Sequence, residues 1–187
     1  MATKNSALIW AFDLGTVTGF AVGNTAAKFP PLSRSVTLDP KKIGNGTAGA
    51  NLIRFFQQEA KIARPALVMV ERAIAAAARA SMGMSEVSNE VTAGLHYILK
   101  ALCVLYGIPR VDATAQTIRK HFVGVGNLGS REATNRAVVS RCQVLGYMPR
   151  TVVDWDRANA LAAWDWAKAH VAHTSPEVLH LFGERAS

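Results

Sequence analysis

Apolar positions along the chain form short continuous runs near the N-terminus and helical patterns further on. The first run, Ala7 to Phe12, has the length and composition of a buried strand. Gly15 and Gly19 flank a turn, and a second apolar run, Phe20 to Val22, follows. We therefore predict an opening pair of strands like a hairpin, with Ser33 to Leu38 as a short third strand at the sheet edge.

A helix and another strand are predicted next. After a flexible loop from Gly44 to Gly49, Asn51 or Thr47 would cap a helix that continues to about Ala63. Pro65 to Glu71 is a second unbroken apolar run, closed by a carboxylate. A continuous run after a helix is typical of a parallel strand that is covered on both faces.

The second half of the chain predicts mainly helices. The segment from Arg72 to Ser85 is Ala-rich and is predicted as a mobile loop or a frayed helical arm. The patterns that follow predict a long helix from Ser85 to Tyr106 ended by Gly107, a short strand from Ile108 to Asp112, a helical turn from Thr114 to His121, a glycine-rich loop over 122–129, a helix from Ser130 to near Gly146, and a last helix from Val152 to about Ala172.

Length and composition predict one domain, residues 1–174, followed by a polar tail, 175–187. No apolar run reaches the roughly 18 residues that a membrane span needs, and the N-terminus does not resemble a secretory signal. Cys103 and Cys142 lack metal-ligand spacing, so we expect two reduced core thiols. The expected setting is the cytoplasm.

The basic charge points to a polyanionic partner. The formal net charge is +8 and the pI is about 9.9. Between Arg110 and Arg150 there are seven Lys and Arg residues and two acidic residues, so much of the excess is local. Nucleic acid is favoured over a membrane surface, because no amphipathic basic helix with an exposed apolar face is found.

Two carboxylates stand at the ends of predicted buried strands. Asp13 interrupts the first apolar run, and an ionised carboxylate there is costly unless a metal, a Lys or Arg side chain, or backbone N–H groups compensate it. The alternative is a strand-end Asp that shares a turn with Thr16. Glu71 lies at the carboxyl end of its strand, where α/β sheets place their sites. Its alternative is a solvated Glu paired with Arg72.

A third acidic position opens the last helix. Asp156 and Asn159 are three residues apart and share a helix face, whereas Asp154 suits the N-cap or an indirect role. Clustered carboxylates persist around cations or by taking up protons, and oxygen ligands select Mg²⁺ or Mn²⁺. A metal pair in a basic protein would hydrolyse phosphodiesters in nucleic acid. Spacing alone does not bring the three acids together.

The order of these motifs resembles the RuvC-like Holliday junction resolvases, especially their phage and prophage branch, which implies the cytoplasm of a bacterial or phage-infected cell. The resemblance covers roughly residues 7 to 170. It rests on the following segments: Asp13-Leu-Gly-Thr-x-Thr-Gly-x-Ala, the strand ending at Glu71-Arg72, Gly107-Ile-Pro, Thr117-Ile-Arg-Lys120-His, Gly124-x-Gly126-Asn127, and Asp156-Arg-Ala-Asn159-Ala-Leu-Ala.

The resemblance implies an α/β RNase H-like fold, with a mixed five-stranded sheet flanked by helices on both faces. It implies a homodimeric crossover junction endodeoxyribonuclease of DNA recombination and repair, which binds branched DNA and uses two Mg²⁺ (or Mn²⁺) ions per site. By position, Asp13, Glu71 and Asp156 would be catalytic metal ligands. Asn159 would replace a fourth acid, a departure that removes one negative charge, and Asp154 is an alternative or compensating ligand.

The resemblance also implies contacts to nucleic acid. Many relatives carry a Lys between the two glycines of the basic loop, where this chain has Val125. Lys120, given a catalytic role, and Arg119 then become the candidates for contact with the scissile phosphate. The alternative is a solvated surface pair. The other predicted nucleic-acid contacts are Arg72, Arg79, His121 and Arg131, and the helix from Ser85 would contribute to the dimer interface.

Three other functions fit parts of the sequence. An ATP-binding protein of the sugar-kinase or actin type also has a first strand followed by Asp-x-Gly-Thr, but such proteins are much longer. A nuclease of the same fold acting on a flap, a fork or RNA is a second alternative. A non-catalytic junction-binding relative is the third, because Asn159 stands where an acid is expected.

Overall fold

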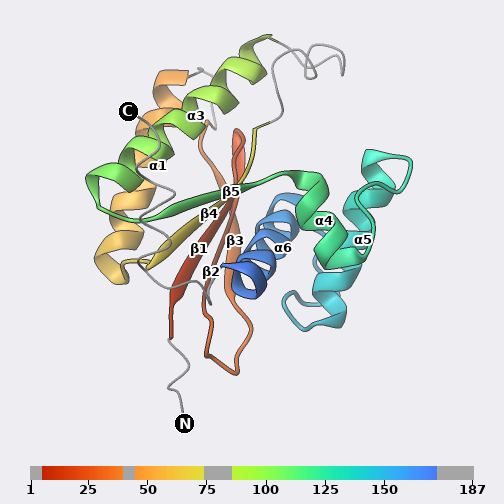
Figure 1. The fold of residues 1–187 in the computed structure, drawn as a ribbon. Coiled ribbons are helices and arrows are strands. Elements are labelled where there is room, and N and C mark those ends of the chain that lie inside the picture. The colour runs from red at the N-terminus through yellow and green to blue at the C-terminus, as the bar shows by residue number, and fades with distance from the viewer. Residues whose placement is uncertain (1–5, 40–44, 74–85, 172–187) are drawn as a thin grey trace.

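The computed structural model describes residues 6–39, 45–73 and 86–171 (Figure 1). The predictions made for Arg79, for the Ala-rich segment over 74–85 and for the tail over 175–187 lie outside these ranges. Among the described residues, no helix is both long and apolar enough to span a membrane.

The centre of the fold is a mixed sheet of five strands in the order β3-β2-β1-β4-β5. The first three strands form an antiparallel meander, and the last two run parallel to β1. Their bounds are β1 Leu8–Asp13, β2 Val17–Asn24, β3 Leu32–Thr37, β4 Leu67–Glu71 and β5 Arg110–Ala113. The predicted hairpin, edge strand and parallel strands are confirmed.

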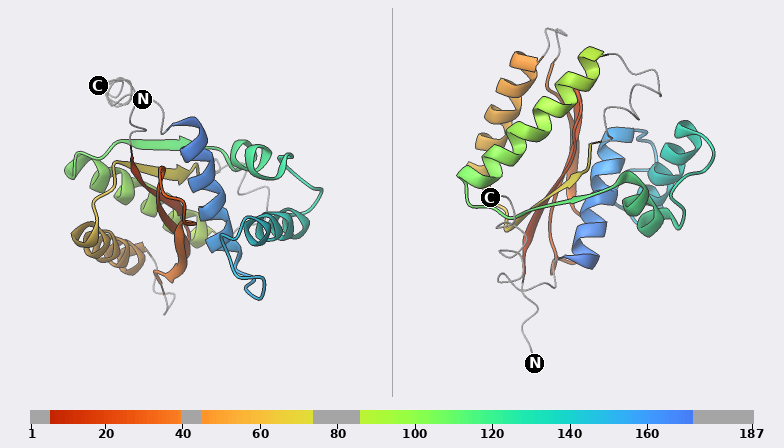
Figure 2. Two further views of the ribbon diagram at one scale, coloured as in Figure 1. Left: turned by 90° about the horizontal axis from the view of Figure 1, so that it is seen from below. Right: turned by 45° about the horizontal axis from the view of Figure 1, so that its top comes forward.

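Helices cover both faces of this sheet. Among the described helices, α1 (Asn45–Ile62) and α3 (Glu86–Leu105) cover one face (Figures 1 and 2). On the other face α6 (Trp155–His170) lies against the strands, and α4 (Ala115–Val123) and α5 (Arg131–Val144) pack against α6. The predicted fold class is therefore confirmed.

The start of α1 differs from the prediction. The segment predicted as a loop, Gly44 to Gly49, is helical from Asn45 onward, so neither Thr47 nor Asn51 is the N-cap. Ala48 is fully buried, and a Cβ on Gly49 would lie 2.5 Å from Cδ1 of Ile98 on α3. The glycine therefore permits close packing of two helices, and this tertiary contact overrides its low helix propensity.

Alternation along the strands divides the core in two. On β1, Trp10 and Phe12 belong to the cluster beneath α1 and α3, whereas Ile9 and Ala11 belong to the cluster beneath α6. Asp13 continues the second series and therefore lies on the α6 face. The same parity holds on β4, where Leu67 and Met69 pack beneath α6 and Glu71 follows them.

Local sequence signals mark the ends of several helices. Gly107, with φ of 57°, follows α3, and Gly124, with φ of 84°, caps the C-terminus of α4. The side chains of Thr114, Ser130 and Asp154 cap the N-termini of α4, α5 and α6.

The two thiols are free and buried, as predicted. Burial raises the pKa of Cys103 and of Cys142 to about 12, which keeps both thiols protonated.

Candidate carboxylate site

Two carboxylates lie at the ends of neighbouring parallel strands. Phe12 of β1 pairs with Val70 of β4, so Asp13 and Glu71 come next at the carboxyl edge of the sheet, on the α6 face. The sheet therefore brings together two acids that are 58 residues apart in the sequence.

A glycine lets the third acid approach. Gly19 pairs with Asp13 in the β1–β2 register. A Cβ on Gly19 would lie 1.9 Å from the backbone oxygen of Asp156 and 3.2 Å from Cβ of Ala160. The first turn of α6 thus lies directly on β2, in a space that any side chain on Gly19 would fill. This contact sets Asp156 beside the end of β1.

The electrostatics of Asp13 place these groups within range of one another's charges. Burial raises the pKa of Asp13 well above its usual value, and the negative charges of Glu71 and Asp156 raise it further. The side chain of Asn159 hydrogen-bonds to the carboxylate and lowers the pKa, as does the positive charge of Arg119. The structure therefore brings Asp13, Glu71, Asp156 and Asn159 into one cluster, the carboxylate cluster.

Two arginines border the carboxylate cluster. Burial raises the pKa of Glu71, and the charges of Arg119 and Arg131 lower it. Burial also raises the pKa of Asp156, followed by the charge of Asp154, while Arg131 lowers it. Arg119 comes from α4 and Arg131 opens α5, so the glycine-rich loop between these helices carries the second arginine to the site.

Arg119 has an unused donor. Its Nε atom is buried and has no hydrogen-bond partner among the described residues. A buried guanidinium N–H without a partner is costly, and an anionic oxygen would satisfy it. Arg72 is exposed just after Glu71, and its backbone N–H donates to the carbonyl of Ala113 at 2.7 Å.

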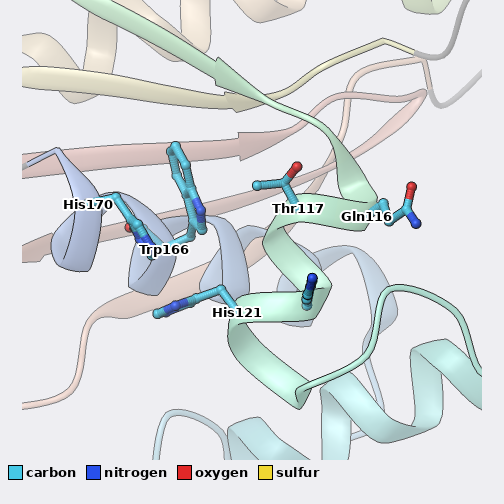
Figure 3. Close-up of a pocket in the computed structure, with 6 residues that line it drawn as sticks. Gln116, Thr117, His121, Trp166 and His170 are labelled. Atoms are coloured by element: carbon cyan, nitrogen blue, oxygen red, sulfur yellow. The ribbon is translucent and has the colours of Figure 1, made fainter.

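Lys120 and His121 lie away from the carboxylates. Neither side chain contributes to the pKa shifts of Asp13, Glu71 or Asp156. Both line a hollow between α4 and α6, which Figure 3 shows. The catalytic role of Lys120 stays a prediction, and Arg119 is the one of the two whose charge acts on Asp13 and Glu71.

Asp154 is engaged elsewhere. Its carboxylate caps α6 by accepting from the backbone N–H of Arg157 at 3.0 Å. The hydroxyl of Ser35 on β3 donates to both of its oxygens, at 2.7 and 2.8 Å. Asp156 is therefore the better placed of the two as a ligand, and Asp154 acts on it through charge.

The turn after β1 does not use Asp13. Thr18 is fully buried, its hydroxyl donates to the carbonyl of Gly15 at 2.7 Å, and it accepts from the N–H of Gly15 at 3.2 Å. The carbonyl of Thr16 accepts from the N–H of Leu38 at 2.8 Å. The alternative of an Asp13–Thr16 turn is therefore not found, and the Gly15 amide that a nucleotide phosphate would need is already paired.

The carboxylate cluster has the donors for a hard divalent cation, but they are not closed around one. Among the described residues, no group of three or more His, Cys, Asp and Glu side chains is arranged to hold a metal ion. The pKa shifts nonetheless show that the acids repel one another, and this repulsion acts over longer distances than metal–ligand bonds. A divalent cation would relieve that repulsion, so the residue types fit such a group.

Comparisons with known proteins identify the fold. No family model matches the sequence, and no curated protein matches it. Among solved structures, RuvC from Thermus thermophilus is 17% identical with a TM-score of 0.63, covering 89% of this chain and 94% of that one. The structure of the T. thermophilus protein in complex with a Holliday junction substrate has 16% sequence identity and a TM-score of 0.61, covering 84% of this chain and 90% of that one. The yeast mitochondrial Holliday junction resolvase has 12% sequence identity and a TM-score of 0.54, covering 93% of this chain and 83% of that one. The chain therefore has a RuvC-like resolvase fold.

Proposed function

We propose that this chain is a divalent-metal-dependent endonuclease that hydrolyses phosphodiester bonds in branched DNA, with the four-way junction as its substrate. The observation that carries the proposal is the convergence of Asp13, Glu71 and Asp156 from β1, β4 and α6. The fold supports it, since one structure of similar fold was solved with a Holliday junction substrate.

In this proposal, Asp13, Glu71 and Asp156 supply carboxylate ligands, and Asn159 supplies a neutral oxygen. Mg²⁺ or Mn²⁺, two ions per site, would provide a water of lowered pKa and stabilise the leaving oxygen. Because the pKa of Asp13 is raised, protons would compete with the cation for this carboxylate, so metal binding should strengthen as pH rises.

The two arginines would position the substrate. Arg119 has a buried Nε donor available for a phosphate oxygen, and Arg131 brings a second positive charge to the side of Glu71 and Asp156. Both charges would hold the scissile phosphate against the carboxylates and offset the repulsion between the two sets of negative oxygens.

We also propose a homodimer, because symmetric cleavage of a four-way junction needs two sites. The outer surface of α3 supports it. Tyr97 and Val104 lie seven residues apart on this helix and are 75% and 74% exposed. An exposed apolar stripe of this kind suits an interface with a second copy.

A non-catalytic junction-binding protein is the second candidate. Two observations favour it: Asn159 stands in the carboxylate cluster, and the cluster is not closed around a cation among the described residues. It predicts tight junction binding with no cleavage at any divalent ion concentration.

Cleavage assays separate these candidates. Four-way junctions, flaps, forks, linear duplex and RNA hairpins are incubated with Mg²⁺, with Mn²⁺ or with EDTA. We expect paired cuts in the four-way junction with either ion and none in EDTA. If a flap, fork or hairpin is cut faster than the four-way junction, that structure is the substrate instead. Junction binding without cutting would support the non-catalytic junction-binding protein.

Asp13→Asn tests the carboxylate cluster directly. Since the side chain keeps its size and loses its charge, we expect junction cleavage to fall by at least about a hundredfold while binding in EDTA is retained. Glu132→Gln is the matched control, because it makes the same chemical change at an exposed helix position that pairs with Arg136. Normal cleavage by Asp13→Asn would refute the metal-ligand assignment.

A further inference from the structure

A hollow of about 470 Å³ lies between α4 and α6, outside the carboxylate cluster. We call it the α4–α6 hollow. Figure 3 shows His121 of α4 beside Trp166 and His170 of α6. The side chains that line it are Gln116, Thr117, Lys120, His121, Trp166 and His170. It therefore combines one permanent positive charge with hydrogen-bonding groups and aromatic rings.

The rings form an ordered stack. Trp166 and His170 are parallel within 13°, with ring centroids 5.0 Å apart. Nδ1 of His170 lies 2.9 Å from the carbonyl oxygen of Trp166, and it must donate because a carbonyl only accepts. His121 approaches the edge of His170 at 4.8 Å. The stack therefore presents flat, polarisable surface that is held in place by a backbone hydrogen bond.

Asp165 fixes the orientation of His121. Its Nε2 lies 3.0 Å from Oδ2 of Asp165, and the hydroxyl of Tyr147 donates to the other oxygen of Asp165 at 2.7 Å. Both oxygens of this carboxylate are thus engaged, and Asp165 does not line the hollow. Lys120 is exposed and has no ion-pair partner among the described residues. A lysine beside aromatic rings suits a phosphate with its attached base.

Helices α4 and α6 connect the α4–α6 hollow to the carboxylate cluster. Arg119, which faces the carboxylates, and Lys120, which lines the hollow, are neighbours on α4 and point about 100° apart. On α6, Trp166 follows Asp156 by ten residues, or about 15 Å along the helix. A helical DNA strand covers that distance in roughly four nucleotides.

We infer that the α4–α6 hollow binds a nucleotide of a single DNA strand that passes from the carboxylate cluster, with Lys120 on its phosphate and the Trp166–His170 stack against its base. The inference rests on the proposed function for the direction of the strand. It goes beyond that function because it assigns a strand-binding site remote from the reacting phosphate. It also gives Lys120 a binding role in place of the predicted catalytic one.

The test is binding of a fluorescently labelled oligothymidylate by anisotropy, in EDTA, over a series of salt concentrations. We expect Lys120→Gln to weaken binding by about threefold to tenfold and to reduce the slope of log affinity against log salt by about 0.7, the value for one phosphate contact on a single strand. His170→Ala should weaken binding by about fivefold or more, with the salt slope unchanged, since it removes stacking and no permanent charge.

Lys61→Gln is the matched control. Lys61 is exposed in the last turn of α1, across the sheet from the hollow, so it makes the same charge change at the other face. Loss of affinity in Lys120→Gln that Lys61→Gln does not show supports the inference. Equal effects of the two variants, or wild-type affinity in both Lys120→Gln and His170→Ala, overturn it.

Two further results keep the inference separate from the proposed function. Absence of Mg²⁺-dependent cleavage by the wild type would refute the nuclease and leave strand binding in EDTA to be judged by itself. A free nucleotide is the other source of the same chemistry, so deoxythymidine monophosphate is added as competitor. The strand-binding site is overturned if deoxythymidine monophosphate displaces the oligonucleotide at low concentration, as a ligand of a tight nucleotide site would, while Lys120→Gln leaves the affinity for the oligonucleotide unchanged.

Discussion

The two faces of the sheet are built from different side chains. Beneath α1 and α3, aromatic rings pack edge to face: Trp10 lies 5.3 Å from Phe56 and 5.6 Å from Phe20 between ring centroids. Beneath α6, glycines of β2 let the helix come close, with Gly19 against the backbone of Asp156 and Gly23 against the ring of Trp164. The first face fills a wide space with rings, and the second brings a helix backbone almost onto the strands.

The difference shows how the fold separates stability from chemistry. Large buried rings remove much apolar area from water and dominate the energetics of a core. Close contact between α6 and β2 fixes Asp156 beside Asp13. Alternation along β1 then keeps Trp10 and Phe12 on the side of the sheet opposite Asp13. The aromatic face holds the sheet on which the other face is assembled.

The largest expected change comes from the aromatic face. Phe56 is fully buried between Trp10 and Tyr106, so Phe56→Ala should lower the free energy of unfolding by about 3–5 kcal/mol. Since Phe56 is remote from the carboxylates, cleavage per folded molecule should remain near normal. Urea denaturation gives the first quantity and junction cleavage below the unfolding midpoint gives the second. A stable but inactive variant would contradict the division between faces.

A smaller change should damage the other face more selectively. Gly19→Ala places a methyl group against the backbone of Asp156, so we expect a loss of about 1–3 kcal/mol in stability and of at least about tenfold in junction cleavage. Gly46→Ala on α1 is the control, because nothing lies within 4 Å of the added Cβ. Its stability should stay equal or rise by up to about 1 kcal/mol. Equal stability and equal junction cleavage in both variants would show that the position of α6 does not depend on the small size of Gly19.

The charge on the carboxylate cluster should appear in the pH dependence of stability. The folded protein holds protons on Asp13 and Glu71 more tightly than the unfolded chain, because their pKa values are raised. Stability without metal should therefore fall as pH rises from about 4 through the raised pKa values. In thermal melts in EDTA, Asp13→Asn should flatten this dependence and Glu132→Gln should leave it unchanged. An identical slope in wild type and Asp13→Asn would mean that Asp13 is solvated.

Most of the fold follows from local patterns. Continuous apolar runs predicted β1 and β4, and Gly107, Ser130 and Gly146 predicted the end of α3 and the bounds of α5, because these signals act within a few residues. The start of α1 was wrong. Gly46 and Gly49 suggested a loop, but packing of Gly49 against Ile98 makes the segment helical, and a contact across about fifty residues leaves no local pattern.

The carboxylate cluster was predictable in its acids and less so in its surroundings. Asp13, Glu71 and Asp156 each stand at an element end, where a sequence pattern can detect them. Arg119 and Lys120 are indistinguishable by sequence, since both belong to one basic stretch, and the rotation of α4 decides which of them faces the carboxylates. The role of Gly19 was missed as well: its place after a strand indicated a turn, whereas its use is to admit α6.

The smallest expected effect concerns how α6 is attached to the sheet edge. Ser35→Ala removes the hydroxyl that donates to both oxygens of Asp154, and we expect a loss of about 0.5–1.5 kcal/mol. Asp154 would still cap α6, so cleavage should change by less than about threefold if Asp156 is the ligand. If Asp154 were the ligand, Ser35→Ala would instead free it and change the Mg²⁺ concentration needed for half-maximal cleavage. Titration of Mg²⁺ with both proteins therefore decides which of the two aspartates binds the ion.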